Sequence, residues 1–269
     1  MYLSHYDLKE KPFQINPDPK FLWLGATHKE ALAILKYGIL DSRGFLLLVG
    51  DVGTGKTTLI NGLLDSLDQD TIVATVPDPG LDKLDFYNFL AHAFKMDSKF
   101  TSKGNFLVQF MHFLHKAHAD KKKVLLVVDE AQRLDDEMLE EIRLLSNIEK
   151  KDARLLNIFL VGQDELNEIL AGTKSWALLQ RITRYSIGPL KKSEIGDYVK
   201  FRLSIAGTEK KIFNSGAIRE ITSFSKCYPR MINIICDHAL LTGYVKGLKK
   251  IDAKVVKECA IALSPPKDS

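Results

Sequence analysis

Short hydrophobic runs alternate with longer amphipathic stretches through the first 190 residues. The amphipathic stretches carry apolar residues at helical spacing, at about 27–40, 57–67, 82–95, 104–119 and 134–148. The short runs are typical of buried strands and lie at 45–49, 71–76, 124–128, 155–161 and, more briefly, 185–188. Strands that alternate with helices predict an α/β fold, with a mainly parallel five-stranded sheet covered by helices on both faces.

The strand pattern stops at about residue 190. Helical patterns near 192–206, 215–225, 230–246 and 252–263 then predict a second, smaller all-helical domain. Residues 1–24 are rich in proline and aromatics, so we expect no regular element there, but a segment that wraps along the next domain through Phe13, Phe21 and Trp23. The predicted organisation is a wrapping segment (1–24), a sheet domain (25–190), a helical domain (191–263) and a disordered tail (264–269).

A glycine-rich turn separates the first strand run from the helical pattern that follows it. The stretch GDVGTGKTT fits G-x-x-x-x-G-K-[ST], the phosphate-loop motif, which requires a strand before it and a helix after it. Backbone N–H groups of such a turn converge on one anion, and the helix N-terminus adds partial positive charge. The residues expected to hold a nucleotide are Gly50, Val52, Gly53, Thr54, Gly55, Lys56, Thr57 and Thr58. A plain glycine turn with a solvated lysine is the alternative, and the intact motif disfavours it.

Lys56 is expected to reach the outer phosphates, and the Thr57 hydroxyl to ligate Mg²⁺. A second acidic element supports this chemistry, because the apolar run 124–128 ends in Asp129 and Glu130. At the carboxyl end of a central strand, Asp129 would hold the metal and Glu130 would orient or deprotonate the attacking water. The stretch between Lys56 and Asp129 has room for an added strand, which favours an ATPase over a small GTPase. A strand that ends in a solvated acidic pair is the alternative.

Composition narrows the class of protein. Hydrophobic residues make up 45% and charged residues 27% of the 269, which is ordinary for a soluble globular chain. No apolar run approaches the roughly 20 residues that span a bilayer, and no secretory signal is visible, so we expect a cytoplasmic protein. Its three cysteines, Cys227, Cys236 and Cys259, are too scattered for a disulfide framework and are expected in the core. The net charge of +4 permits contact with nucleic acid without arguing for it.

Further polar residues follow the predicted elements at chosen places. Gln163 comes just after the fourth run, Arg181 and Arg184 come just before the last short strand, and Arg230 begins a helix of the second domain. With the two phosphate-site motifs, Walker A and Walker B, this arrangement resembles the AAA+ ATPases. The resemblance implies that Gln163 senses the outer phosphate, that Arg184 or Arg181 is an arginine finger given to a neighbouring subunit, and that Arg230 contacts the phosphates from a helical lid.

The arginine assignments have alternatives. Arg184 is preferred as the finger because it directly precedes Tyr185, which opens the predicted strand, and Arg181 is the alternate. Either can instead be a surface arginine in an ordinary ion pair. Arg230 follows Pro229 at a helix start, where the helix dipole disfavours a cation unless a phosphate lies nearby.

A narrower resemblance extends over residues 1–262. The stretches YDLKEKPFQINPDPKFLWLGATHKEALAILKYGI, GFLLLVGDVGTGKTT, VVDEAQ, LVGQDEL, LQRITRY and PRMINIICDHAL together look like ExeA/GspA-type general secretion ATPases and their relatives in pilus biogenesis and TniB-like transposition. The family implies a cytoplasmic Mg²⁺-dependent ATPase that forms a ring or filament of copies, with the arginine finger in trans, and assembles a secretion or pilus machine.

The family resemblance leaves several alternatives open. Secretion members often carry a transmembrane segment and a periplasmic peptidoglycan-binding domain after the ATPase, and this sequence has neither. We therefore expect either the cytoplasmic part of an inner-membrane protein or a relative that never had those parts, with membrane contact only through a partner or a missing carboxyl-terminal segment. A DNA-dependent transposition-type ATPase is a second function, marked by salt-sensitive binding to duplex DNA. A slow nucleotide switch that scaffolds partners is a third, separated by whether turnover rises as copies assemble.

Overall fold

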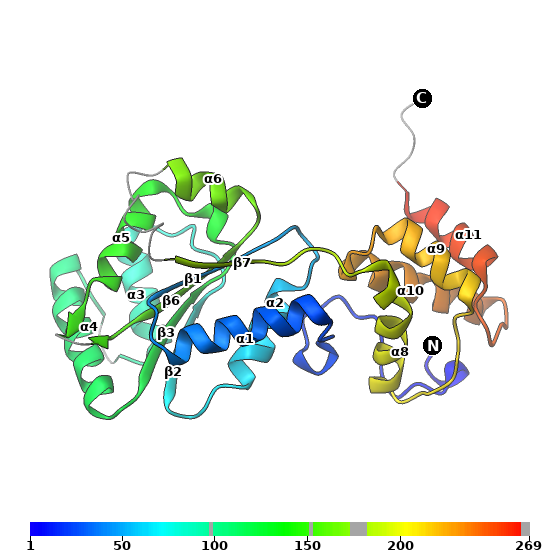
Figure 1. The fold of residues 1–269 in the computed structure, drawn as a ribbon, viewed down its shortest axis with the longest axis horizontal. Helices are drawn as coiled ribbons and strands as arrows, with labels where there is room; N and C mark the ends of the chain where they lie inside the picture. Colours follow the sequence, from blue (N-terminus) through cyan, green and yellow to red (C-terminus); the bar gives the residue numbers. More distant parts are fainter. Residues whose placement is uncertain (97–98, 151–152, 173–181, 265–269) are drawn as a thin grey trace. The chain divides into compact units, whose positions relative to one another are not determined.

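The computed structural model describes residues 1–96, 99–150, 153–172 and 182–264 (Figure 1). The chain divides into two compact units. We call residues 29–51 and 62–187 the sheet unit, and residues 1–28, 52–61 and 188 onward the helical unit. Arg181 and all of the predicted tail except Ser264 lie outside the described residues. Within the described residues, no helix combines the length and the apolar content needed to cross a bilayer.

The sheet has five parallel strands in the order β2-β3-β6-β1-β7, which confirms the predicted fold class. Its strands are β1 (Phe45–Val49), β2 (Thr71–Val76), β3 (Lys123–Val128), β6 (Asn157–Gly162) and β7 (Ile182–Ser186). β1 and β6 are buried along their whole length, and β3 is buried from its second residue, as expected of central strands whose faces are both covered. The last strand starts three residues before its predicted position, because pairing with β1 from Phe45 to Val49 sets its ends at Ile182 and Ser186.

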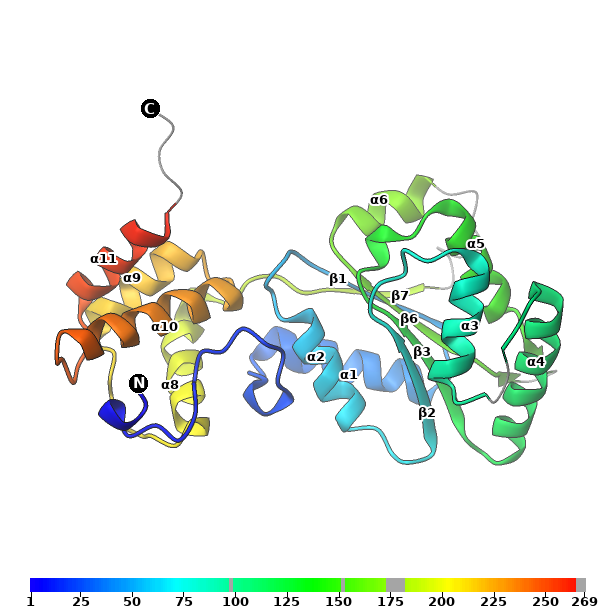
Figure 2. The same cartoon turned by 180° about the vertical axis from the view of Figure 1, so that it is seen from behind.

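Helices cover both faces of the sheet. The sheet unit contains most of α1 (Ala26–Leu40) and the end of α2 (Lys56–Asp65), with α3 (Lys83–Ala93), α4 (Lys103–Ala119), α5 (Asp136–Ser146) and α6 (Glu165–Gly172). Alternate strand residues such as Leu47 and Leu126 join a core with α3 and α4, which lie beside each other in both views (Figures 1 and 2). Leu46 points to the other face, where Gly38 of α1 lies against it.

The sequence analysis did not predict two features of the sheet unit. One is α6, whose eight residues follow β6 almost directly. The other is a two-stranded antiparallel ribbon of β4 (Glu149–Lys150) and β5 (Ala153–Arg154). Both elements are too short for a hydrophobic period to stand out from the surrounding sequence.

The carboxyl-terminal helices form a separate core in the helical unit. They are α8 (Ile195–Ile205), α9 (Ser215–Ser225), α10 (Pro229–Val245) and α11 (Ala253–Leu263), in agreement with the predicted all-helical pattern. Local chemistry sets two of their starts: the side chain of Asn214 accepts from the N–H of Ala217, and Asp252 accepts from Val255. Cys227, Cys236 and Cys259 are buried free thiols in this core, as expected.

The amino-terminal segment also packs in the helical unit. It contains two short 3₁₀ turns, Ser4–Tyr6 and Pro19–Phe21, and it contributes Tyr2, Tyr6, Leu8 and Phe13 to the helical core. Of the three expected anchors, Phe13 and Phe21 are buried, and Trp23 packs against Tyr198 and Phe201. These anchors therefore pack in the helical unit, and not along the sheet domain that was expected as their partner. Arg202 of α8 holds the segment in this unit, because its guanidinium donates to the backbone carbonyls of Pro12 and Gln14.

Candidate nucleotide-binding site

The phosphate loop has the strand–turn–helix context that its motif requires. β1 ends at Val49, the glycine turn follows, and α2 begins at Lys56, so Lys56, Thr57 and Thr58 form the first turn of this helix. Gly53 and Gly55 have φ of +81° and +98°, a backbone conformation that side chains with a Cβ rarely adopt. The motif's glycines are therefore required by the path of the chain.

Two hydrogen bonds orient the peptide units of this loop. The carbonyl of Gly53 accepts from the backbone N–H of Arg230 at 3.2 Å, and the carbonyl of Thr54 accepts from Nε2 of His28 at 3.2 Å. In a trans peptide the carbonyl and the next N–H point in opposite directions. The N–H groups of Thr54 and Gly55 consequently point away from these donors, as an anion-binding turn needs.

His28 is a residue of this loop's surroundings that the sequence analysis missed. It is 4% exposed at the start of α1, and its Nε2 carries a proton because the Thr54 carbonyl can only accept a hydrogen bond. Burial lowers its pKa, against the opposing effects of the Thr54 bond and the charge of Glu194. A lone histidine carries no motif in the sequence, so the fold alone identifies it.

Arg230 lies beside the loop within the helical unit. It begins α10 directly after Pro229, and its side chain is exposed. A Cβ added to Gly53 would lie 2.8 Å from the Cβ of Arg230, so the first turn of α10 closely approaches the loop. Arg230 thus belongs to the helix that contacts the phosphate loop. Contact between its guanidinium and the phosphates stays a prediction.

The acidic element lies at the carboxyl edge of the sheet. Val76, Val128 and Leu160 are register partners across β2, β3 and β6, and Val49 pairs with Gly162. The residues that follow these strands therefore leave the sheet at one edge. They include Asp129, Glu130 and Gln163 in the sheet unit, together with Gly50 and Asp51 after β1. This is the edge where open α/β sheets bind ligands.

The backbone at this edge is locally unusual. The N–H of Asp129 donates to the carbonyl of Val76 at 2.9 Å and so extends the pairing of β3 with β2. Glu130 has φ of +50° and ψ of +36°, a left-handed conformation that is uncommon outside glycine. Its own N–H donates to Oδ1 of Asp129 at 2.9 Å. Such conformations concentrate at functional sites.

Gln132 connects two of the predicted site residues, and the sequence analysis assigned it no role. Its Nε2 donates to Oε2 of Glu130 at 2.5 Å, and its Oε1 accepts from the backbone N–H of Gln163 at 3.1 Å. Gln132 is thus the direct link between the end of β3 and the end of β6. It belongs to the stretch VVDEAQ, but nothing in the spacing of that stretch indicates the link.

The two predicted metal ligands have the chemistry that Mg²⁺ prefers, while their joint action stays a prediction. The Thr57 hydroxyl and the Asp129 carboxylate are hard oxygen ligands, and Mg²⁺ is commonly held by one or two such groups together with substrate phosphates. Among the residues with described positions, no group of three or more His, Cys, Asp or Glu side chains is arranged to hold a metal. A protein-only metal cage is therefore not a feature of the described chain.

Of the two finger candidates, only Arg184 can be placed. It lies in β7, the strand at one edge of the sheet, and its side chain is exposed. The neighbouring Tyr185 has a raised pKa because of its burial and its hydrogen bond to Glu30. An exposed arginine on an edge strand is accessible to a second copy, but its role stays a prediction.

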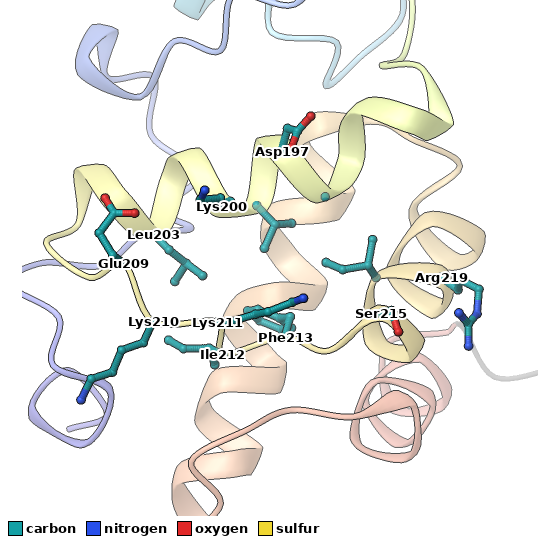
Figure 3. Close-up of a pocket in the computed structure, with 13 residues that line it drawn as sticks. Asp197, Lys200, Leu203, Glu209, Lys210, Lys211, Ile212, Phe213, Ser215 and Arg219 are labelled. Carbon is teal, nitrogen blue, oxygen red and sulfur yellow. The ribbon is translucent and has the colours of Figure 1, made fainter.

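The helical unit also contains a pocket of about 610 Å³, which the sequence analysis did not predict. α8, the segment that leads to α9, and α9 itself form its walls (Figure 3). Leu203, Ile212 and Phe213 line it, and charged groups such as Lys200 surround it. Figure 3 shows Lys210 pointing away from Phe213, toward the amino-terminal segment, where its ammonium pairs with Asp7. The volume lies in the range of small-molecule sites.

Comparisons with known proteins show what this chain is similar to. A family model described as an AAA domain matches residues 39–170. The chain is 40% identical to General secretion pathway protein A of Aeromonas hydrophila over 254 residues, which is 93% of this chain and 46% of that protein. The chain thus spans about half the length of this relative.

Solved structures show the same fold. The Aeropyrum pernix ORC2 protein, in its ADPNP–ADP complexes, matches with a TM-score of 0.71 at 14% identity, covering 97% of this chain and 73% of that one. Cdc6p from Pyrobaculum aerophilum matches with a TM-score of 0.69 at 17% identity, covering 91% of this chain and 71% of that one. At these identities the likeness concerns the fold alone.

Proposed function

Because the chain is an AAA+ protein that resembles General secretion pathway protein A over nearly its whole length, we propose that it is a Mg²⁺-dependent ATPase that drives assembly of a secretion or pilus machine. The observation that carries the proposal is the phosphate loop, whose Gly53 and Thr54 carbonyls are held by Arg230 and His28. The N–H groups of Thr54 and Gly55 point away from these two donors, and this orientation suits the phosphates of a nucleotide.

Each residue of the site has a distinct part in the proposed reaction. Lys56 binds the outer phosphates at the start of α2, and Glu130 takes a proton from the attacking water. Thr57 and Asp129 would hold Mg²⁺, which would supply positive charge to neutralise the phosphates. Gln163 orients the outer phosphate or the water from the end of β6.

The conformational change that follows hydrolysis would be transmitted through the helical unit. The first turn of α10 is bonded to the loop at Gly53, so a change at the phosphates reaches Arg230 and the rest of α10 directly. Arg184, from a second copy, would supply positive charge to the transferring phosphoryl group. Hydrolysis would then require a ring or filament, and turnover per copy would rise with protein concentration.

Two variants test the proposal. Lys56→Ala should lose ATP binding, measured by calorimetry with Mg²⁺ and a non-hydrolysable analogue. Glu130→Gln should bind that analogue normally and hydrolyse ATP about 10²–10⁴ times more slowly, the usual contribution of a general base. A wild-type protein that neither binds nor hydrolyses Mg·ATP would refute the ATPase, and wild-type turnover by Glu130→Gln would refute the assignment of the base.

The cellular role needs its own test. In the source cell, a chromosomal Glu130→Gln should stop export or pilus formation while the protein accumulates to its normal level. Normal export by that strain would remove the secretion role and leave the ATPase chemistry untouched.

A further inference from the structure

Gln132 holds one atom of Glu130 and one atom of Gln163 at the same time. Its amide nitrogen donates to Oε2 of Glu130 at 2.5 Å, and its amide oxygen accepts from the N–H of Gln163 at 3.1 Å. The two ends of one planar amide thus span the carboxyl ends of β3 and β6.

The chemistry of the partners fixes the orientation of this amide. A backbone N–H can only donate, so it must face Oε1, and the NH₂ end must then face Glu130. An NH₂ group cannot accept a hydrogen bond, so the Glu130 oxygen that meets it is an acceptor. The bridge therefore uses Oε2 of Glu130 as its acceptor and leaves Oε1 for the water.

The turn that carries Gln132 is tied on both sides. It is a single 3₁₀ turn, Ala131–Arg133, that follows the left-handed Glu130. On one side the guanidinium of Arg133 pairs with Asp78 after β2, and on the other side Gln132 bonds to Gln163 after β6. The Arg133 pair is exposed and contributes little, whereas Gln132 is half-buried and contacts the carboxylate directly.

The end of β6 is shaped to receive Gln132. A Cβ added to Gly162 would lie 2.8 Å from Oε1 of Gln132 and 2.8 Å from Cδ2 of Leu166. Any side chain at residue 162 would therefore push the Gln132 amide away from the Gln163 N–H. The absence of a side chain at Gly162 is a steric condition of the bridge.

We propose that Gln132 is a positioning residue that holds the Glu130 carboxylate in place against the end of β6. The inference rests on the proposed function, because it takes Glu130 as the base. It adds a coupling: the backbone of Gln163 is bonded to the residue that holds the base, so a shift of Gln163 at the phosphates moves Glu130 too. Gln132→Met and Gly162→Ala each perturb this Gln132 bridge.

Gln132→Met tests the link, because methionine has a similar length and forms no such bonds. We expect kcat to fall at least tenfold, since small misplacements of a catalytic group are costly, while affinity for a non-hydrolysable ATP analogue stays within twofold. In a Glu130→Gln background the same substitution should change kcat by less than twofold, because there is no base left to position. Gly162→Ala should reproduce the fall in kcat without altering Gln132 itself.

Arg133→Ala is the matched control, since it removes the tie on the other side of the same turn and should leave kcat within twofold of wild type. The inference is overturned if Gln132→Met retains wild-type kcat, if its loss persists in full on Glu130→Gln, or if the loss lies in analogue affinity. These outcomes differ from failure of the proposed function, in which the wild type does not hydrolyse ATP or Glu130→Gln hydrolyses it at the wild-type rate.

Discussion

Arg202 is the buried cation that joins the amino-terminal segment to α8, and its removal should release that segment. The side chain is 6% exposed. Its Nε donates to the Pro12 carbonyl at 2.5 Å, and a terminal nitrogen donates to the Gln14 carbonyl at 3.1 Å. Its guanidinium also lies 4.5 Å from the ring centre of Phe21. One side chain therefore fixes three points of the segment.

The magnitude follows from what Arg202→Met removes. Hydrogen bonds to a charged group contribute about 1.5–3 kcal/mol each, and two such bonds to carbonyls are lost. Removing the guanidinium also removes the cost of burying it, which offsets part of that loss. Methionine fills much of the same volume, so no large cavity forms. We expect the free energy of unfolding to fall by about 3 kcal/mol.

Urea unfolding followed by tryptophan fluorescence measures this change. Trp23 is one of two tryptophans, so a Trp176→Phe background reports on the segment alone. With a typical urea dependence of about 2–3 kcal/mol per molar, the midpoint of the Trp23 transition should fall by about 1–1.5 M. Arg219→Met, at an exposed arginine of α9, is the control and should shift it by less than about 0.3 M.

The reasoning has a clear refutation. If Arg202→Met stays within about 1 kcal/mol of wild type, the apolar anchors Phe13 and Phe21 suffice to hold the segment, and the guanidinium does not select its position. Arg202→Lys sharpens the test, because it keeps the charge and loses the planar fork, and it should be nearly as unstable as Arg202→Met.

Three further predictions concern the site. Burial lowers the pKa of His28, so the stabilising effect of its neutral ring is complete above the ordinary histidine pKa of 6.5 and is lost as pH falls through the folded pKa. His28→Gln should therefore flatten the fall in thermal midpoint between about pH 7 and pH 5, and an unchanged slope would contradict this. Gly53→Ala should weaken ATP binding about tenfold in calorimetry, because the new Cβ would lie 2.8 Å from that of Arg230 at a φ of +81°. Mixing Arg184→Ala with Glu130→Gln should restore ATPase activity if the finger acts in trans, and an inactive mixture would refute an arginine finger supplied by a second copy.

Local patterns in the sequence were sufficient for the five strands of the parallel sheet, most helices and the phosphate loop. Runs such as 45–49 and 124–128 are apolar because both faces of a central strand are covered. Each residue of such a strand must therefore be apolar, so the run is visible in the sequence itself. The loop before Lys56 could be recognised because its glycines, strand and helix are consecutive in the chain. The acidic pair Asp129 and Glu130 could be placed at the sheet edge for the same reason.

Contacts between distant residues had to come from the tertiary structure. The amino-terminal segment joined the helical unit through Arg202 and Pro12, which are 190 positions apart, so no local period could indicate it. His28 and Gln132 gained their roles from single hydrogen bonds to Thr54, Glu130 and Gln163. Periodicity and motif spacing reflect interactions between residues that are near one another in the chain. The carbonyl to which a buried side chain donates depends instead on how whole helices and strands pack.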